Sequence, residues 1–211
     1  QKLWLHRATM AHCAERLRAD GLRVDIAPYQ RETGMIARVV AGLAQDGVTK
    51  IALADPVDHT VTKRLTKAAE DAGVALSVYP TPGFLNSEGD NAAWSDGRKR
   101  WFMAEFYKYQ RKRLDVMMDG DDPQGGQWSF DEDNRKKVPK ARLGDIPPLP
   151  AINRSKTDLE ARESIEAEFP DNYGTLEHLI YPTTQEGAAD WLIRFLQDRM
   201  NEFGPYEDAI V

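Results

Sequence analysis

Cysteine is almost absent from this chain, which has one, Cys13, among 211 residues. An internal disulfide is therefore excluded, which fits a reducing compartment, and we expect the protein in the cytoplasm. Long apolar runs are missing as well, since no stretch approaches the roughly 20 residues of a membrane span. Near the start, Leu3 to Leu5 is interrupted by His6 and Arg7 before it could form the core of a signal peptide. We expect no membrane partner.

Several motifs of well-known chemistry are also missing. There is no P-loop and no Gly-x-Gly-x-x-Gly. His12 and His59 lack metal-ligand spacing, so we interpret both as surface or internally satisfied histidines. The acidic clusters at 119–122 and 131–134 lack the glycine and terminal glutamate of a calcium-binding EF-hand. A net charge of -6 argues against a uniformly basic nucleic-acid-binding protein, although a local basic patch is compatible with it.

Helical and strand patterns alternate over the first 80 residues. Apolar residues recur at helical spacing in 3–17, 35–43 and 61–69. Strand patterns occupy 22–26, 50–54 and 74–79. Gly21, Gly47 and Gly73 each end a predicted helix and precede a predicted strand. Strands that alternate with helices predict an α/β domain with a doubly wound, mostly parallel sheet of the Rossmann or flavodoxin-like type.

The pattern changes after residue 80. Further predicted helices are 97–118, 159–169 and 184–203. Between the first two, residues 119–157 show no clear periodicity and contain Pro147-Pro148-Leu149-Pro150. We therefore predict three regions: an α/β domain at 1–118, an interdomain linker at 119–157 and the start of an all-α domain at 158–211.

Basic residues crowd the predicted helix at 97–118, which also carries five aromatic residues. They are Arg98, Lys99, Arg100, Lys108, Arg111, Lys112 and Arg113. One interpretation is a surface that contacts phosphates or faces a flavin-binding domain. The other is a solvated helix face whose aliphatic stems cover apolar neighbours, and the acidic residues at 115–122 favour it.

The most informative stretch is Gly125–Lys136, with the sequence GGQWSFDEDNRK. Two glycines free the backbone, Trp128 and Phe130 favour burial, and a charged run leads to Pro139. Because low aromatic content is typical of disordered segments, we predict an ordered crossover loop that joins two domains. A solvated linker with two chance aromatic residues is the alternative.

This stretch, together with Phe169-Pro170-Asp171-Asn172-Tyr173-Gly174, closely resembles the photolyase-related branch of the cryptochrome/photolyase family. Members of that branch carry an iron–sulfur cluster and repair (6-4) photoproducts. The resemblance extends along almost the whole chain through Met10-Ala11-His12, Asp55-Pro56, Gly97-Arg98-Lys99 and Phe203-Gly204. It implies three cofactors: FAD, an antenna 6,7-dimethyl-8-ribityllumazine and a 4Fe–4S cluster. It also implies damaged DNA as the partner of a monomeric protein.

The resemblance further implies a strand and a loop before Gln1 and a large helical domain after Val211. We therefore expect this chain to be the antenna fragment of a longer protein and to be inactive alone. Cys13 by itself cannot hold the cluster, which needs four thiolates.

One group of candidate binding residues lies at the turn after the predicted strand at 50–54. In an open parallel sheet, ligands bind outside the carboxyl ends of the strands, and Asp55-Pro56 directly follows the strand at 50–54. The resemblance assigns His6, Asp55, Pro56 and Val57 to the lumazine, and Tyr206 and Asp208 to the start of the flavin site. The sequence alone leaves an alternative for Asp55, the N-cap of the following helix.

The resemblance implies that the parent protein is a deoxyribodipyrimidine photolyase-type lyase. It would use light to reverse a (6-4) photoproduct by electron transfer from reduced FAD to a base flipped out of the DNA duplex. Two alternatives are a blue-light-sensing cryptochrome without repair activity and a stand-alone nucleotide-binding or protein-interaction module.

Overall fold

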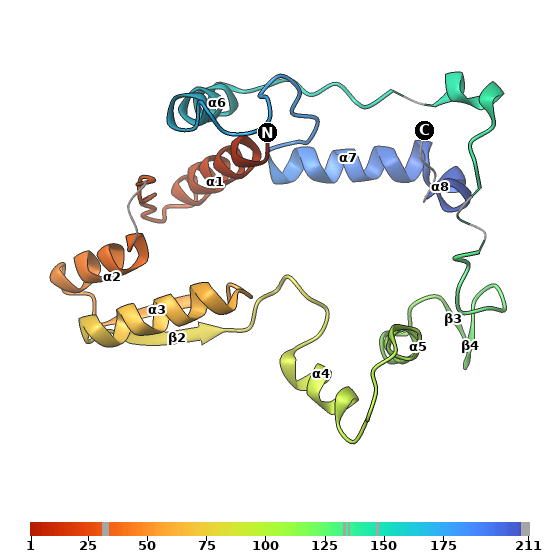
Figure 1. Cartoon of the computed structure of the whole chain (residues 1–211), viewed down its shortest axis with the longest axis horizontal. Coiled ribbons are helices and arrows are strands. Elements are labelled where there is room, and N and C mark those ends of the chain that lie inside the picture. Colours follow the sequence, from red (N-terminus) through yellow and green to blue (C-terminus); the bar gives the residue numbers. More distant parts are fainter. Residues whose placement is uncertain (31–33, 133, 135, 147, 208–211) are drawn as a thin grey trace. The chain divides into compact units, whose positions relative to one another are not determined.

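The computed structural model describes residues 1–30, 34–132, 134, 136–146 and 148–207. Its helices are α1 (Lys2–Ala19), α2 (Met35–Gln45), α3 (His59–Ala72), α4 (Glu88–Ser95), α5 (Met103–Leu114), α6 (Lys156–Glu168), α7 (Gln185–Asp198) and α8 (Met200–Tyr206), with a 3-10 segment η1 at Lys140–Asp145 (Figure 1). Its strands are β1 (Lys50–Ala54), β2 (Ala75–Tyr79), β3 (Met118–Asp119) and β4 (Asp122–Pro123).

The chain divides into two compact units. One contains residues 1–26 and 127–211, and the other contains residues 27–126. Among the described residues, none of the helices has both the length and the apolar character needed to cross a membrane.

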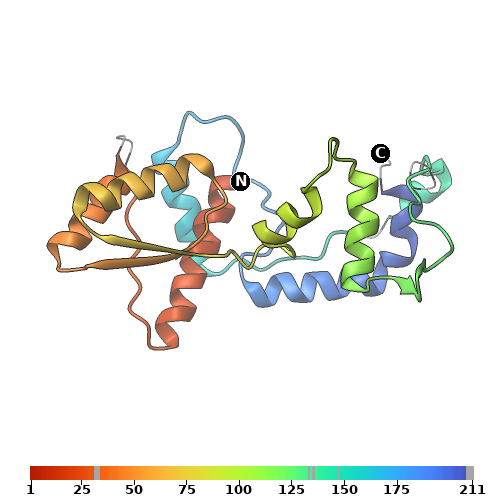
Figure 2. The same cartoon turned by 90° about the horizontal axis from the view of Figure 1, so that it is seen from below.

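The unit formed by residues 27–126 is built on a parallel β1–α3–β2 arrangement. The two strands pair in register from Lys50 opposite Ala75 to Ala54 opposite Tyr79. Helix α3 crosses over the strands and α2 packs against α3 (Figures 1 and 2). The predicted α/β character is thus confirmed. The described residues contain this one parallel pair, so the larger doubly wound sheet stays a prediction.

Local signals explain where α3 begins and ends. The side chain of Asp58 accepts a hydrogen bond from the backbone N–H of Val61 at 2.8 Å and caps the helix. Gly73 adopts a left-handed conformation (φ 66°) and the Val74 N–H donates to the Ala69 carbonyl. Such a turn favours glycine because it has no Cβ.

The strand predicted at 22–26 was wrong. In the structure this segment has no strand conformation, and Leu22 and Ile26 are 56% and 45% exposed. Instead the Arg18 guanidinium donates to the Val24 carbonyl from both Nε (3.1 Å) and Nη2 (2.7 Å). A strand needs a neighbour for its backbone groups, and here a side chain of the preceding helix occupies the central carbonyl.

The helix predicted at 97–118 is shorter than expected at both ends, since α5 begins at Met103 and ends at Leu114. Asp115 takes a left-handed conformation (φ 52°). The side chain of Arg111, 6% exposed, turns back and donates to the carbonyls of Val116 and Met117. The predicted helix at 184–203 is likewise divided into α7 and α8, with non-helical dihedrals at Arg199 (φ -131°, ψ -25°).

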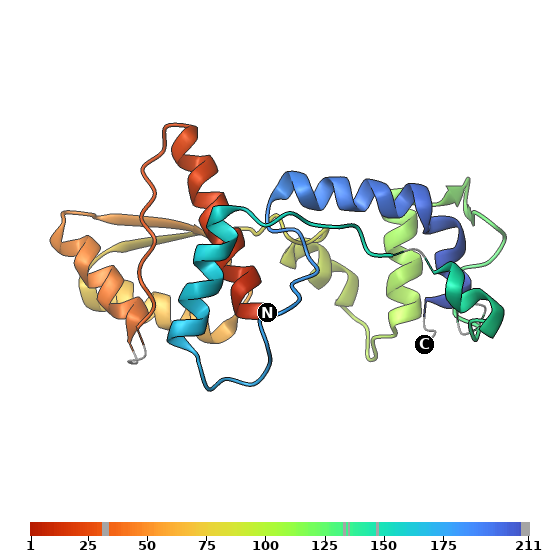
Figure 3. The same cartoon turned by 90° about the horizontal axis from the view of Figure 1, so that it is seen from above.

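The core of the other unit lies between α1 and α6, which pack side by side (Figure 3). It consists of the buried residues Trp4, Ala8, Ala161, Ile165 and Leu179. Trp4 is 4% exposed, and its indole Nε1 donates to the backbone carbonyl of Asp158 at 2.7 Å. The guanidinium carbons of Arg154 and Arg162 lie 5.5 and 5.8 Å from the Trp4 ring centroid, within cation–π range.

A second contact joins the same two helices outside this core. Both terminal nitrogens of Arg7 donate to the Glu168 carboxylate at 2.8 Å, a bidentate arrangement. Arg7 also donates to the Ser164 hydroxyl. Because the Arg7 and Glu168 side chains are 27% and 35% exposed, solvent screens this pair and we assign most of the stabilisation to the apolar core.

We expect Trp4→Ala to lower the free energy of unfolding by about 3–5 kcal/mol, the range for deleting a buried large aromatic side chain. The substitution also removes the donor to Asp158. Urea denaturation followed by far-UV circular dichroism measures the change. Trp101→Ala is the matched control, because Trp101 is 70% exposed and its loss should have little effect. Equal destabilisation by both substitutions would contradict the assignment of the core.

Candidate functional site

The turn that follows β1 is held by the side chain of Asp55. Oδ1 of this side chain accepts a hydrogen bond from the Val57 N–H at 2.8 Å. The backbone N–H of Asp55 donates to the Tyr79 carbonyl at 2.8 Å and so continues the contact between the two strands. Asp55 is half-buried, whereas Pro56 and Val57 are exposed. Since Asp58 caps α3, the alternative interpretation of Asp55 as the helix N-cap was wrong.

Val57 occupies an uncommon backbone conformation, with φ 53°. A β-branched residue in this region is strained, at a cost of about 1–2 kcal/mol, and the bond from its N–H to Asp55 holds it in place. Strain of this kind is concentrated at functional turns. The turn therefore presents one carboxylate and one exposed apolar side chain at the carboxyl end of a parallel strand.

A second candidate location is the contact between the crossover loop and α8. The Lys136 N–H donates to the Pro205 carbonyl at 3.1 Å. Asn134 Nδ2 donates to Glu207 Oε2 at 3.0 Å, across 73 positions of sequence. Asn134 Oδ1 is buried and has no hydrogen-bond partner among the described residues. Two of the segments that carry the family resemblance thus meet, leaving a buried acceptor at their junction.

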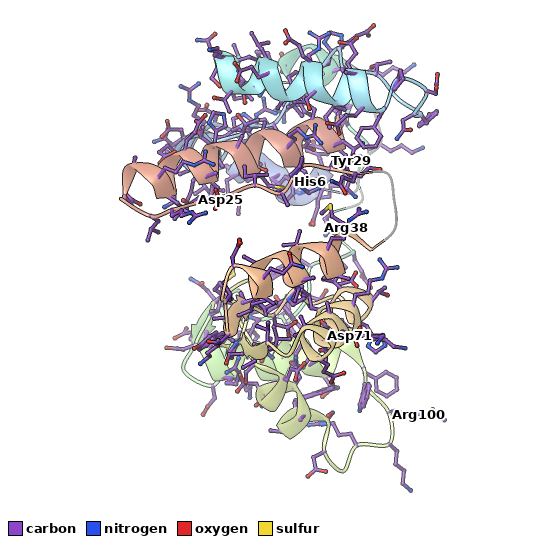
Figure 4. The ribbon with its side chains drawn as sticks, turned by 90° about the vertical axis from the view of Figure 1, so that its left-hand side faces the viewer. His6, Asp25, Tyr29, Arg38, Asp71 and Arg100 are labelled. Carbon is purple, nitrogen blue, oxygen red and sulfur yellow. The ribbon has the colours of Figure 1, made fainter. Side chains whose placement is uncertain are left out.

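The structure brings together three of the six predicted site residues. Asp55, Pro56 and Val57 form the single turn after β1. His6 lies exposed on α1, in the unit formed by residues 1–26 and 127–211 (Figure 4).

The two predicted flavin-site residues lie at the end of the chain. Tyr206 is the half-buried last residue of α8, and Asp208 is outside the described residues, as are Asp133 and Arg135 of the crossover loop. Asn134 was missed, although it lies within the recognised GGQWSFDEDNRK stretch.

Metal-ligating residues do not cluster in the part of the chain that the structure describes. No group of three or more His, Cys, Asp or Glu residues there is placed to hold a metal ion. The single cysteine, Cys13, is exposed on α1. One thiol falls well short of the four thiolates of a 4Fe–4S cluster, so the residues of this chain do not fit that group.

His12 belongs to a polar network beside the α1–α6 core. Its Nε2 lies 3.1 Å from Asp158 Oδ1 and 3.4 Å from Ser155 Oγ, and its Nδ1 lies 3.4 Å from Glu15 Oε2. His12 was interpreted as a surface or internally satisfied histidine, and these contacts agree with the second of these interpretations. Its role is to join α1 to the first turn of α6.

Asp158 is the buried acid of this network, 2% exposed. Burial by itself raises the pKa of its carboxyl group. Hydrogen bonds from Thr183, from the Ser155 backbone and from His12 act in the opposite direction and prevail, so the pKa of Asp158 is lowered. The carboxylate also completes a capping box with Ser155 at the start of α6.

The β1–α3–β2 unit is an α/β arrangement, and its turn after β1 lies at the edge where parallel sheets typically bind ligands. The chain matches the deoxyribodipyrimidine photo-lyase-related protein family over residues 1–181 and belongs to that family.

Two relatives are similar to this chain. It is 30% identical over 210 residues to a (6-4) photolyase of Agrobacterium fabrum, an alignment that covers 97% of this chain and 40% of the relative. It is 28% identical over 142 residues to an uncharacterized protein of Acanthamoeba polyphaga mimivirus, covering 65% of this chain and 71% of that protein. The chain therefore spans about two fifths of the length of the photolyase.

We expect the stabilising effect of the Asp158 carboxylate to disappear in acid. A carboxyl group whose pKa is lowered by folding stabilises the protein fully above its unfolded-state pKa of about 4, and this stabilisation is lost as the pH falls through the lower folded-state value. Asp158→Asn should therefore lower the free energy of unfolding by about 1–3 kcal/mol at pH 5. The difference from wild type should shrink between pH 5 and 2.5.

Urea denaturation across this pH range measures the effect. Glu160→Gln on the same helix is the control, because Glu160 is exposed and pairs only with Lys156 at 3.4 Å in the described contacts. A difference between wild type and Asp158→Asn that stays constant down to pH 2.5 would rule out this role.

Proposed function

We propose that this chain is the antenna-chromophore portion of a light-driven DNA-repair flavoprotein of the iron–sulfur, photolyase-related branch, and that the parent protein reverses (6-4) photoproducts. The observation that carries the proposal is the 30% identity to a (6-4) photolyase across 97% of this chain. The family match supports it, since residues 1–181 include the crossover loop. Damaged DNA would bind the helical portion of a monomeric parent protein. The division into residues 1–118, 119–157 and 158–211 belongs to the same proposal.

The junction of the crossover loop with α8 is the proposed edge of the flavin site. Reduced FAD, when bound, supplies the electron that opens the lesion. Asn134 Oδ1 is a buried acceptor that an N–H of a bound group would satisfy. Tyr206 ends α8 close in sequence to Pro205 and Glu207, which the loop contacts, and the family resemblance adds Asp208. In this proposal the loop orders the start of the flavin site.

The turn after β1 is the proposed antenna site. Asp55 presents a half-buried carboxylate that could accept a hydrogen bond from a ribityl hydroxyl or a ring N–H. Val57, 54% exposed, and Pro56 offer an apolar surface to a planar ring. The family resemblance also assigns His6 to the lumazine. No role in holding the iron–sulfur cluster is assigned to this chain, because one cysteine does not fit it.

We expect the purified parent protein to show flavin absorption bands, an antenna shoulder and light-dependent loss of the lesion from an oligonucleotide that contains one (6-4) photoproduct. Chromatography of the oligonucleotide after blue illumination measures the repair. The same mixture kept in the dark is the control. Flavin bands without repair would identify a light sensor of the cryptochrome type. A protein that stays colourless after reconstitution with FAD would contradict both functions.

We expect Asp55→Ala to reduce the lumazine content of the purified protein about tenfold, the effect of losing one hydrogen bond to a charged group. Absorbance of the chromophore released by denaturation measures the content. Asp71→Ala is the matched control, since Asp71 is an exposed acid of the same unit that pairs with Lys67 at 2.9 Å. Equal lumazine content in the two variants would remove Asp55 from the antenna site.

A further inference from the structure

The segment from the end of the α4–α5 loop to the first residue of α5 exposes three consecutive basic side chains followed by three consecutive apolar ones. Trp101, Phe102 and Met103 are 70%, 59% and 78% exposed. Directly before them, Arg98, Lys99 and Arg100 are also exposed, and Arg100 extends away from the ribbon (Figure 4). We call residues 98–103 the aromatic–basic surface. An apolar group of this size at the surface of a protein typically marks an interaction site.

A hollow of about 390 Å³ lies beside this surface, lined mainly by the rings of Trp94, Trp101, Phe102 and Phe106. Its inner wall is well supported. Trp94 packs against Phe106 in an edge-to-face arrangement, with ring centroids 4.9 Å apart.

The Arg98 side chain is held over the inner wall of the hollow. Its guanidinium carbon lies 4.6 Å from the Trp94 ring centroid, and its Nε donates to the Trp94 carbonyl at 2.7 Å. The aromatic wall and its neighbouring cation are therefore fixed before any ligand arrives, which lowers the entropic cost of binding.

The local charge of the loop differs in sign from that of the chain. Residues 94–103 contain three basic residues and one acidic residue, Asp96, whereas the whole chain has a net charge of -6. Two acidic residues of the flanking helices face other cations, since Asp90 lies 3.7 Å from Arg113 and Glu105 lies 3.5 Å from Lys108, whereas Glu88 is exposed in the first turn of α4. The loop thus offers a net positive charge to a partner.

We propose that the aromatic–basic surface binds single-stranded nucleic acid. A base stacks on Trp101 and Phe102, and the backbone phosphates lie against Lys99 and Arg100. Every base has a π-face, so stacking platforms beside cations bind single strands with little sequence preference. Of these six residues only Lys99 is of a type depleted at protein interfaces, so the preference for nucleic acid rests on the run of three cations beside the aromatic rings. This binding requires neither light nor a lesion, and it goes beyond the repair function proposed above.

Fluorescence anisotropy of a labelled 12-nucleotide oligothymidylate, titrated in the dark with the purified protein, tests the proposal. We expect Trp101→Ala to weaken binding about 5- to 100-fold, the effect of removing one stacked base contact. Trp101→Phe keeps a ring and should retain most of the affinity. The double variant Lys99→Ala/Arg100→Ala should reduce the slope of log affinity against log salt by about 1.4, because each phosphate contact in a single strand contributes about 0.7.

Two matched controls lie in the other unit. Tyr173→Ala removes a fully exposed aromatic residue, and Lys156→Ala removes an exposed cation whose side chain is 89% accessible. Both should leave the affinity and the salt dependence unchanged. Circular dichroism verifies that each variant is folded, and Trp101→Phe with the double variant decides the matter if Trp101→Ala is unfolded.

Wild-type affinity in Trp101→Ala, or an unchanged salt slope in the double variant, would overturn the proposal. A change of oligomeric state in Trp101→Ala without a change in oligonucleotide affinity would also overturn it and would identify a protein interface. Because the oligonucleotide is undamaged and the titration is dark, its failure is distinguishable from failure of the repair assay.

Discussion

The hydrogen bond from the Trp4 indole to the Asp158 carbonyl connects two segments 154 positions apart, and the unit that contains both chain ends depends on it. The indole fills the small core between α1 and α6, where the other buried residues are two alanines, one isoleucine and one leucine. The same Asp158 completes the capping box of α6 through its carboxylate and accepts from His12 of α1. Asp158 therefore both caps the start of α6 and attaches α6 to α1. Losing the Asp158 carboxylate would weaken the cap and the contact between the two helices together.

The two candidate locations use different physical means to present polar groups. At the turn after β1, an Asp side chain holds Val57 in a strained conformation, and the exposed apolar residue and the carboxylate share one edge of the sheet. At the junction of the crossover loop with α8, backbone and amide hydrogen bonds join segments that the sequence separates widely, and one buried amide oxygen stays without a partner among the described residues. Strain and an unsatisfied acceptor are both costly in the absence of a ligand, which is why they favour these places as binding sites.

Elements with strong local signals were predicted well. The apolar run at 50–54 became β1 with the same bounds, and Gly47 and Gly73 end α2 and α3 in left-handed conformations. Elements that depend on distant partners were predicted poorly. The alternation at 22–26 indicated a strand, but Arg18 occupies the Val24 carbonyl. The site shows the same division, since an Asp-Pro turn was evident from sequence and the buried acceptor of Asn134 was not.

The sequence by itself determined the α/β alternation, the glycine-terminated helices, the turn at Asp55 and the family resemblance, because each depends on residues close together in the chain. Only the tertiary structure showed that Asp58 rather than Asp55 caps α3, that Arg111 turns back to the carbonyls beyond α5, and that Trp4 reaches Asp158. Periodicity shows which side of a helix is apolar, but it carries no information on which distant backbone group will accept a hydrogen bond. That choice is made when the chain packs and every buried polar group must find a partner.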